Sequence, residues 1–253
     1  MTQALTDILK HPEIWRVGQL PRRVKPSIPT GFPDFDRLLP ARGWEQGAMT
    51  EILANDQGIG EMSLLAPALR QTTLAGRNVV IAGVPYVPFP HAWESLGISL
   101  NNVLLLRAEG AHLLWSLEQA ARSASCAIIV AWTTACRKEL TYQALRRLHR
   151  AAETGGATLI LFRPENIIDQ ASPAPTRIAL KSTLGKLHLR IFKRRGAMLA
   201  ETIRINVFPD HWTSRTIHCD QTVIVKHRNH SQVFGATISS SNPQPHLQLL
   251  ASR

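Results

Sequence analysis

Along residues 28–208, apolar runs typical of strands alternate with amphipathic segments typical of helices, which predicts one α/β domain. Short apolar runs predict strands, and the segments between them carry apolar residues every three or four positions, as amphipathic helices do. The runs predicted to be strands are Ala48–Leu53, Asn78–Ala82, Val103–Leu106, Cys126–Trp132 and Ala157–Phe162. Their alternation with helices indicates a mostly parallel sheet flanked by helices, with right-handed crossovers.

The pattern changes on both sides of this alternation. Residues 186–194 and 201–207 alternate in hydrophobicity and flank Arg195-Gly196, which predicts a C-terminal antiparallel hairpin at the sheet edge. Residues 1–27 read as a short N-terminal helix and a basic, proline-containing linker. Residues 209–253 are rich in Ser, Asn, Gln and His, and we predict a polar, flexible tail there.

The composition indicates where the protein is located and what kind of partner it binds. A chain of 253 residues with 44% hydrophobic residues can bury one substantial core. It has no secretory signal pattern, no apolar run near the ~20 residues of a membrane span, and no paired cysteines, so we expect a cytoplasmic protein without a membrane partner. The net charge of +11 favours a polyanionic partner, DNA above all, with nucleoid association when DNA is bound. A solvated basic surface is the alternative.

The stretch Asn55–Ser63 lies between a predicted strand and a predicted helix, where a P-loop carries G-x-x-x-x-G-K-[ST]. Aligned on Gly60, the stretch has Asn55 for the first glycine, Glu61 for the phosphate-binding lysine and Met62 for the magnesium-binding hydroxyl. A glutamate there repels phosphate, whereas it suits the first turn of a helix. We therefore predict a degenerate, non-functional nucleotide site formed by Asn55, Gly58, Gly60, Glu61 and Met62.

An ordered series of motifs carries a family resemblance over roughly residues 14–207. The motifs are Pro29-Thr30-Gly31, Phe35-Asp36, Leu38-Leu39, Gly43–Gly47, Thr50–Ile52, Gly58–Glu61, Ala131-Trp132, Leu161–Pro164 and Phe192–Gly196. Together they resemble the ImuA family of RecA-like proteins associated with translesion DNA synthesis, and some are shared with the shorter SulA family. The resemblance implies a RecA-like core and an accessory role in SOS-induced, error-prone synthesis. The implied partners are an ImuB-like Y-family polymerase homologue and an error-prone replicative-type polymerase, with self-association as a further expectation.

The same resemblance leaves two other functions open. A SulA-like protein would inhibit cell division by binding a tubulin-like protein, and a divergent RecA-like protein would be a DNA-dependent ATPase. An ATPase of this kind would carry one carboxylate after the second strand and another at the end of the fourth, where this chain has Gly83-Val84-Pro85 and Ala131-Trp132-Thr133. We therefore predict a protein that is not an enzyme and has no cofactor.

Cations near the predicted hairpin are candidate DNA contacts because lysine and arginine bind phosphates without sequence preference. They are Lys186, Arg190, Lys193, Arg194 and Arg195, joined by Arg163 because strand-end loops face DNA in RecA-like cores. A solvated hairpin tip is the alternative. The residues His211, His218, Cys219, His227 and His230 lack the regular spacing of a zinc site, so we predict no metal.

Overall fold

The computed structural model describes residues 25–183, 186–196, 202–206, 235–236 and 249–250. The chain separates into two compact units, residues 1–208 and residues 209–253. Most of the predicted N-terminal helix and linker, at 1–27, lies outside the described residues. In the second unit, β11 (Gly235–Ala236) pairs antiparallel with β12 (Leu249–Leu250), and the rest of the predicted 209–253 tail, including its histidines, lies outside the described residues.

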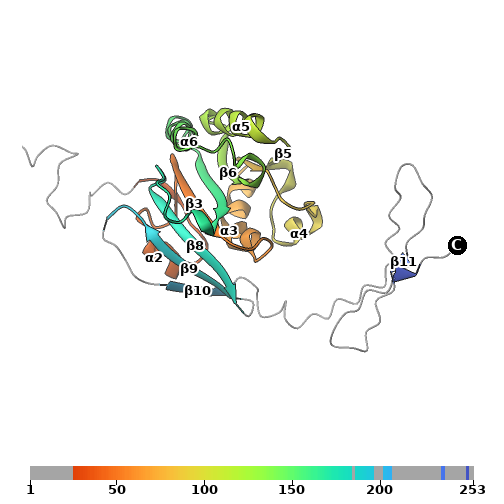
Figure 1. Ribbon diagram of the computed structural model, residues 1–253. Coiled ribbons are helices and arrows are strands. Elements are labelled where there is room, and N and C mark those ends of the chain that lie inside the picture. Colours follow the sequence, from red (N-terminus) through yellow and green to blue (C-terminus); the bar gives the residue numbers. More distant parts are fainter. Residues whose placement is uncertain (1–24, 184–185, 197–201, 207–234, 237–248, 251–253) are drawn as a thin grey trace, which may run out of the picture. The chain divides into compact units, whose positions relative to one another are not determined.

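One mixed sheet of eight strands forms the centre of the first unit, in the order β10-β9-β8-β3-β7-β6-β4-β5 (Figure 1). Its strands are β3 (Ala48–Ala54), β4 (Asn78–Ala82), β5 (Val103–Leu106), β6 (Cys126–Trp132), β7 (Thr158–Pro164), β8 (Thr176–Thr183), β9 (Lys186–Lys193) and β10 (Thr202–Asn206). The six strands from β8 to β5 run parallel, whereas β9 pairs antiparallel with both of its neighbours, β8 and β10. The predicted mostly parallel α/β sheet and its C-terminal antiparallel hairpin are confirmed.

Helices follow the parallel strands because each crossover must return the chain to the same edge of the sheet. The α-helices are α2 (Pro33–Leu38), α3 (Glu61–Leu74), α4 (Pro90–Ser95), α5 (Gly110–Arg122) and α6 (Tyr142–Gly155), and the 3₁₀ helices are η1 (Leu100–Asn102), η2 (Thr134–Cys136) and η3 (Glu165–Ile167). Local chemistry sets the ends of α6. Thr141 caps its start by accepting the N–H of Ala144 at 3.2 Å, and Gly156 ends it in a left-handed conformation.

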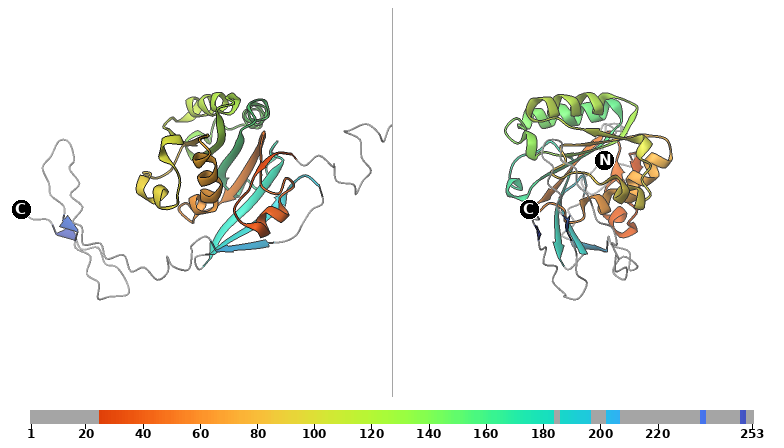
Figure 2. Two further views of the ribbon diagram at one scale, coloured as in Figure 1. Left: turned by 180° about the vertical axis from the view of Figure 1, so that it is seen from behind. Right: turned by 90° about the vertical axis from the view of Figure 1, so that its right-hand side faces the viewer.

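The helices lie on opposite faces of the sheet (Figure 2), and an apolar cluster on each face holds them there. On one face, α3 and α4 pack against side chains of β3, β4, β6 and β7. On the other face, α5 and α6 pack against the alternate side chains of the same four strands. These central strands are buried on both faces, which explains why their sequences are apolar runs without alternation.

The segment before β3 covers one face of the antiparallel end of the sheet. Strand β1 (Ser27–Ile28) pairs antiparallel with β2 (Trp44–Glu45), and α2 lies between them in sequence. Phe35 and Trp44 meet edge to face with ring centroids 5.4 Å apart, in the same cluster as Leu187, Leu189 and Ile205 of the hairpin. One face of β9 and β10 is therefore part of the core.

The opposite edge of the sheet, at β5, is different in character. Leu104 and Leu105 of this edge strand are 53% and 40% exposed. Exposed apolar side chains on an edge strand are uncommon because unpaired edges invite association. Among the described residues, no helix combines the length and the apolar character that crossing a membrane requires.

Candidate functional site

The loop of residues 55–60 joins the carboxyl end of β3 to the first turn of α3. Gly58 and Gly60 have φ angles of 73° and 112°, a region that residues with a Cβ atom rarely adopt. Gly60 is also the residue that caps the start of α3. The loop therefore turns sharply, and it places backbone N–H groups at the positive end of the helix dipole, as anion-binding loops do.

The Glu61 carboxylate folds back into this loop and accepts two of its N–H groups. The nitrogen of Gly58 donates to Oε1 at 3.0 Å, and the nitrogen of Gly60 donates to Oε2 at 3.2 Å. Glu61 is only 2% exposed. Because carboxylate and phosphate oxygens are both anionic acceptors, this side chain occupies donors of the kind that hold a phosphate in a nucleotide-binding loop. It still complements the helix dipole, as predicted from its position.

The other residues predicted for this site lie in the same loop and helix start. The Asn55 Nδ2 atom donates to Oε2 of Glu165 at 2.7 Å, and Oε1 of Glu165 lies 3.2 Å from Nζ of Lys181. Met62 is half-buried against the apolar cluster under α3. The structure thus brings the five predicted residues together, and the side chains of Asn55, Glu61 and Met62 all have internal partners.

Aromatic rings lie where the carboxylates of an ATPase are expected. Trp132, at the end of β6, stacks on Phe162 of β7 with ring centroids 4.8 Å apart, and Tyr86 meets Trp132 edge to face at 6.0 Å. Gly83 follows β4 with a φ of 60°, and a Cβ atom there would lie 2.4 Å from the Trp132 carbonyl oxygen. Burial, followed by the nearby Glu61 charge, raises the pKa of Tyr86 to about 12. The apolar packing leaves no carboxylate at the end of either strand.

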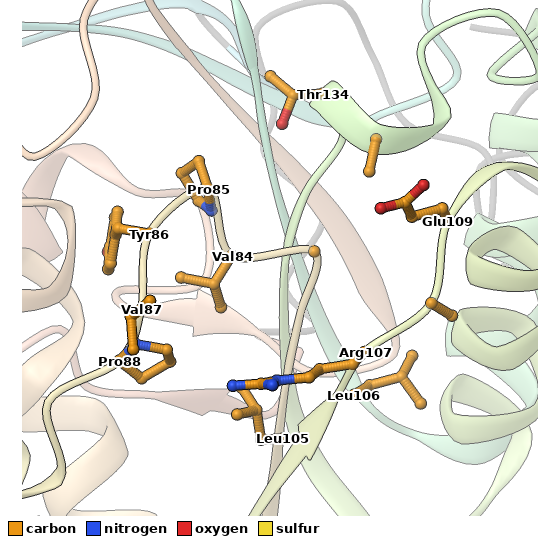
Figure 3. A pocket seen from close by; sticks show the side chains of 13 residues that line it. Val84, Pro85, Tyr86, Val87, Pro88, Leu105, Leu106, Arg107, Glu109 and Thr134 are labelled. Atoms are coloured by element: carbon orange, nitrogen blue, oxygen red, sulfur yellow. The ribbon is translucent and has the colours of Figure 1, made fainter. Parts of the chain in front are cut away.

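A pocket of about 550 Å³ opens beside these rings, at the carboxyl ends of β4, β5 and β6 (Figure 3). The segment Val84–Pro88 lines one side, and Glu109 lies across from it (Figure 3). Tyr86 of that segment, Arg107 and Thr134 are its other charged or hydroxyl-bearing side chains. In open α/β sheets, ligands bind outside the carboxyl ends of the strands, so the position is a favourable one. The lining, however, holds no nucleophile paired with a base.

A buried ionic network lies on β3, beside the loop. Glu51 is fully buried and accepts from Nη1 of Arg163 at 2.7 Å, from Oγ of Ser172 at 2.8 Å and from Nε of Arg177 at 2.8 Å. These donors come from β7, from the connection that follows it and from β8. A buried carboxylate with two guanidinium partners satisfies its charge inside the protein and ties three neighbouring strands together.

Arg177 extends this network into the connection between β7 and β8. Its guanidinium group donates to the carbonyl oxygens of Ile167, Ile168 and Gln170 at 2.9–3.1 Å. The network was missed in the sequence, although one signal was present. Glu51 is the one charged residue in the apolar strand Ala48–Ala54, and a charge in a strand buried on both faces requires an internal partner.

The structure divides the six candidate DNA contacts into two groups. Arg163 is buried on Glu51, Arg195 is paired with Glu45 at 2.8 Å, and Arg194 donates to the Leu38 carbonyl oxygen. Lys193 donates to the Ser172 carbonyl oxygen at 2.6 Å, and its pKa is lowered by burial and by Arg177. The remaining two, Lys186 and Arg190, are exposed on β9. Four of the six cations therefore bind other groups of the protein itself.

In the described part of the chain, no group of three or more His, Cys, Asp or Glu side chains is placed to hold a metal ion. Both described cysteines, Cys126 and Cys136, are free and buried. Burial, with a contribution from Glu139, raises the pKa of Cys136 to about 11, which makes its thiolate scarce near neutral pH.

Together, the sheet and the loop of residues 55–60 define an α/β protein whose loop resembles an anion-binding site. The Glu61 carboxylate occupies the position of the anion. No protein-family model matches the chain. It is similar to the cell division inhibitor SulA of Edwardsiella piscicida, with 29% identity over 103 residues, which is 40% of this chain and 59% of SulA. The chain thus spans less than two thirds of the curated relative it matches.

Proposed function

We propose that this protein is a non-catalytic, RecA-like accessory protein that acts by binding other proteins. The observation that carries the proposal is the Glu61 carboxylate, which is bonded to the N–H groups of Gly58 and Gly60 that a phosphate would need. The ends of β4 and β6 support it, because Gly83 and the stacked ring of Trp132 stand where an ATPase would carry its carboxylates. A RecA-like fold that lacks the phosphate site and the catalytic carboxylates is suited to binding other proteins through its surface.

Within this class, we favour an adaptor role in SOS-induced translesion synthesis. The partners would be an ImuB-like polymerase homologue and an error-prone replicative-type polymerase. The motif series of the sequence supports this role, together with the antiparallel strands β9 and β10 that extend the sheet. The direct test is recovery of the tagged full-length protein from DNA-damaged cells, followed by mass spectrometry of bound proteins. Recovery without either polymerase would contradict the adaptor role.

The similarity to SulA favours a second candidate function, inhibition of cell division through a tubulin-like protein. Overproduction in growing cells separates the two functions. An adaptor leaves cell length unchanged and its deletion lowers damage-induced mutagenesis, whereas a division inhibitor produces long undivided cells. Recovery of a tubulin-like protein in the same purification would identify the second function directly.

The absence of nucleotide chemistry is tested separately on the purified protein. A ligand at 1,000 times its Kd stabilises the folded state by about 4.1 kcal/mol, so 1 mM Mg-ATP would raise the Tm of a micromolar binder by several degrees. We expect no change in Tm and no phosphate release, with or without single-stranded DNA. Turnover that disappears in the E61A variant would overturn the proposal and restore the third function, a divergent ATPase.

A further inference from the structure

The second face of the antiparallel strands β8, β9 and β10 is the feature that the proposed function leaves unexplained. Along β9, Leu187, Leu189 and Ile191 are buried, and the residues between them point to the other side. None of the described helices covers that other side of β9 and β10, since α5 and α6 lie over the central strands (Figure 1). It is an open sheet surface.

The strand register places five basic side chains on this surface. His188 of β9 lies directly opposite Lys181 of β8 and Arg204 of β10, and Lys186 and Arg190 are its neighbours along β9. We call Lys181, Lys186, His188, Arg190 and Arg204 the basic sheet face. Lys181, Lys186, Arg190 and Arg204 are exposed, and His188 is half-buried.

Little negative charge balances this surface. The described residues of β8, β9 and β10 include no Asp or Glu. Glu165 reaches Lys181 from the neighbouring connection, but Lys186, Arg190 and Arg204 form no ion pair with any described residue. The Lys and Arg side chains gathered on one face repel one another, so an anion bound here would relieve this repulsion as well as gain attraction. The surface is therefore built to attract a polyanion.

Dimensions indicate the kind of polyanion. Alternate residues of a strand are about 6.6 Å apart and neighbouring strands about 4.8 Å, so the basic sheet face spans roughly 13 Å by 10 Å. One nucleic-acid strand carries a phosphate about every 3.4 Å along a helix, so about three or four phosphates fit across it. Phe192, on the same strand, keeps its ring 6.0 Å from the Arg190 guanidinium, which holds that side chain against the sheet.

From this charge, spacing and openness, we propose that the basic sheet face binds the phosphate backbone of one nucleic-acid strand. It does so without reading sequence, because its contacts are cation to phosphate. The proposal goes beyond the adaptor function and keeps only two of the sequence-predicted contacts, Lys186 and Arg190. It adds Lys181, His188 and Arg204, which register alone brings to them.

The experiment uses the purified full-length protein and a fluorescein-labelled oligo(dT) of about 20 nucleotides, with binding followed by anisotropy at several salt concentrations. For three or four phosphates, the slope of log K against log salt is about −2 to −3 for a single strand. The variant K186E/R204E reverses two charges of the basic sheet face. We expect it to weaken binding at least tenfold and to make the salt slope shallower.

The matched control is R146E/R150E, which changes the net charge equally at two exposed positions of α6. It should weaken binding less than threefold, and circular dichroism should show both variants folded. Equal losses in the two variants would overturn the proposal, because net charge alone would then explain binding. Unchanged binding by K186E/R204E would also overturn the proposal. Displacement of the oligonucleotide by poly-glutamate at matched charge concentration would overturn it as well. Since no partner protein is present, these results are independent of the polymerase pull-down.

Discussion

The Glu61 carboxylate and a bound phosphate would compete for the same two N–H groups, those of Gly58 and Gly60. The internal carboxylate has the advantage of being covalently held beside them, so it needs no ligand concentration. A lysine at the same position would point a cation at the site and leave both donors free for a ligand. One residue therefore changes the loop from a ligand site to a closed structural turn.

Replacing the carboxylate by an amide tests this description. The E61Q variant loses the charge that both N–H groups bond, and hydrogen bonds to charged groups contribute about 1.5–3 kcal/mol. We expect the free energy of unfolding to fall by about 1–2 kcal/mol, measured by urea denaturation. The control is E94Q in α4, where the carboxylate is 53% exposed, and it should change stability by less than about 0.5 kcal/mol.

His149 of α6 gives the molecule a pH dependence. Burial lowers its pKa, an effect that Glu153 opposes and Arg195 and Lys25 reinforce. Its Nδ1 atom is buried without a hydrogen-bond partner among the described residues, as suits a neutral ring. The unfolded chain therefore binds the His149 proton more tightly than the folded protein does. As a result, the free energy of unfolding falls as the pH drops below about 6.5.

Removing His149 should flatten the pH dependence of stability in that range. We expect H149Q to lose less stability than the parent protein between pH 7.5 and pH 5.5, measured by urea denaturation at both values. The variant H91Q removes an imidazole that is 79% exposed and should retain the slope of the parent. An H149Q slope equal to that of the parent would show that the buried ring does not resist protonation.

Among the elements, β3, β7 and β8 are joined by side chains as well as by backbone pairing. Glu51 on β3 bonds both Arg163 on β7 and Arg177 on β8, and Arg177 also holds the connection between those two strands. Removing the carboxylate would leave two guanidinium groups buried without a counter-charge. The network thus fixes the strands beside the loop that Glu61 closes.

The E51A variant should be among the most destabilising single changes in the molecule. Breaking a buried ion pair by deleting one partner costs about 3–5 kcal/mol, so we expect a Tm lower by many degrees or an insoluble protein. The control E165A removes a carboxylate whose two partners, Asn55 and Lys181, are both exposed, and it should cost less than about 1 kcal/mol. Similar Tm values for the two variants would contradict the structural role of Glu51.

The sequence predicts elements well where burial dictates composition. The predicted ranges Asn78–Ala82, Val103–Leu106 and Cys126–Trp132 are those of β4, β5 and β6, because a short apolar run has few other uses. The hairpin was also predicted, since alternation and a central Arg195-Gly196 are local signals. Helix ends are harder to predict because the first and last turns depend on caps such as Thr141.

Side-chain partners could not be predicted in the same way. Glu51 pairs with residues 112 and 126 positions later in the chain, which only the sheet order brings close. The direction of the Glu61 side chain depends on the loop conformation that Gly58 and Gly60 permit. Likewise, a list of cations cannot separate Arg195, which bonds Glu45, from Arg204, which faces solvent, until the strand register is known.

At the scale of the whole molecule, the two ends of the sheet have opposite character. The β10 end presents the basic sheet face, and the β5 end presents Leu104 and Leu105. The proposed adaptor role would need surfaces that act independently, and these two are separated by the full width of an eight-stranded sheet. A partner at one end would leave the other end free.

The exposed β5 edge also determines how the purified protein should behave in the laboratory. Unpaired backbone groups flanked by leucines allow edge-to-edge pairing, so we expect turbidity and growing hydrodynamic radius as the sample is concentrated, most of all at high salt where the net charge of +11 is screened. A single L104K substitution should suppress this in dynamic light scattering, whereas L74K, at an exposed leucine on α3, should not. Crystallisation and storage would then begin from the L104K protein.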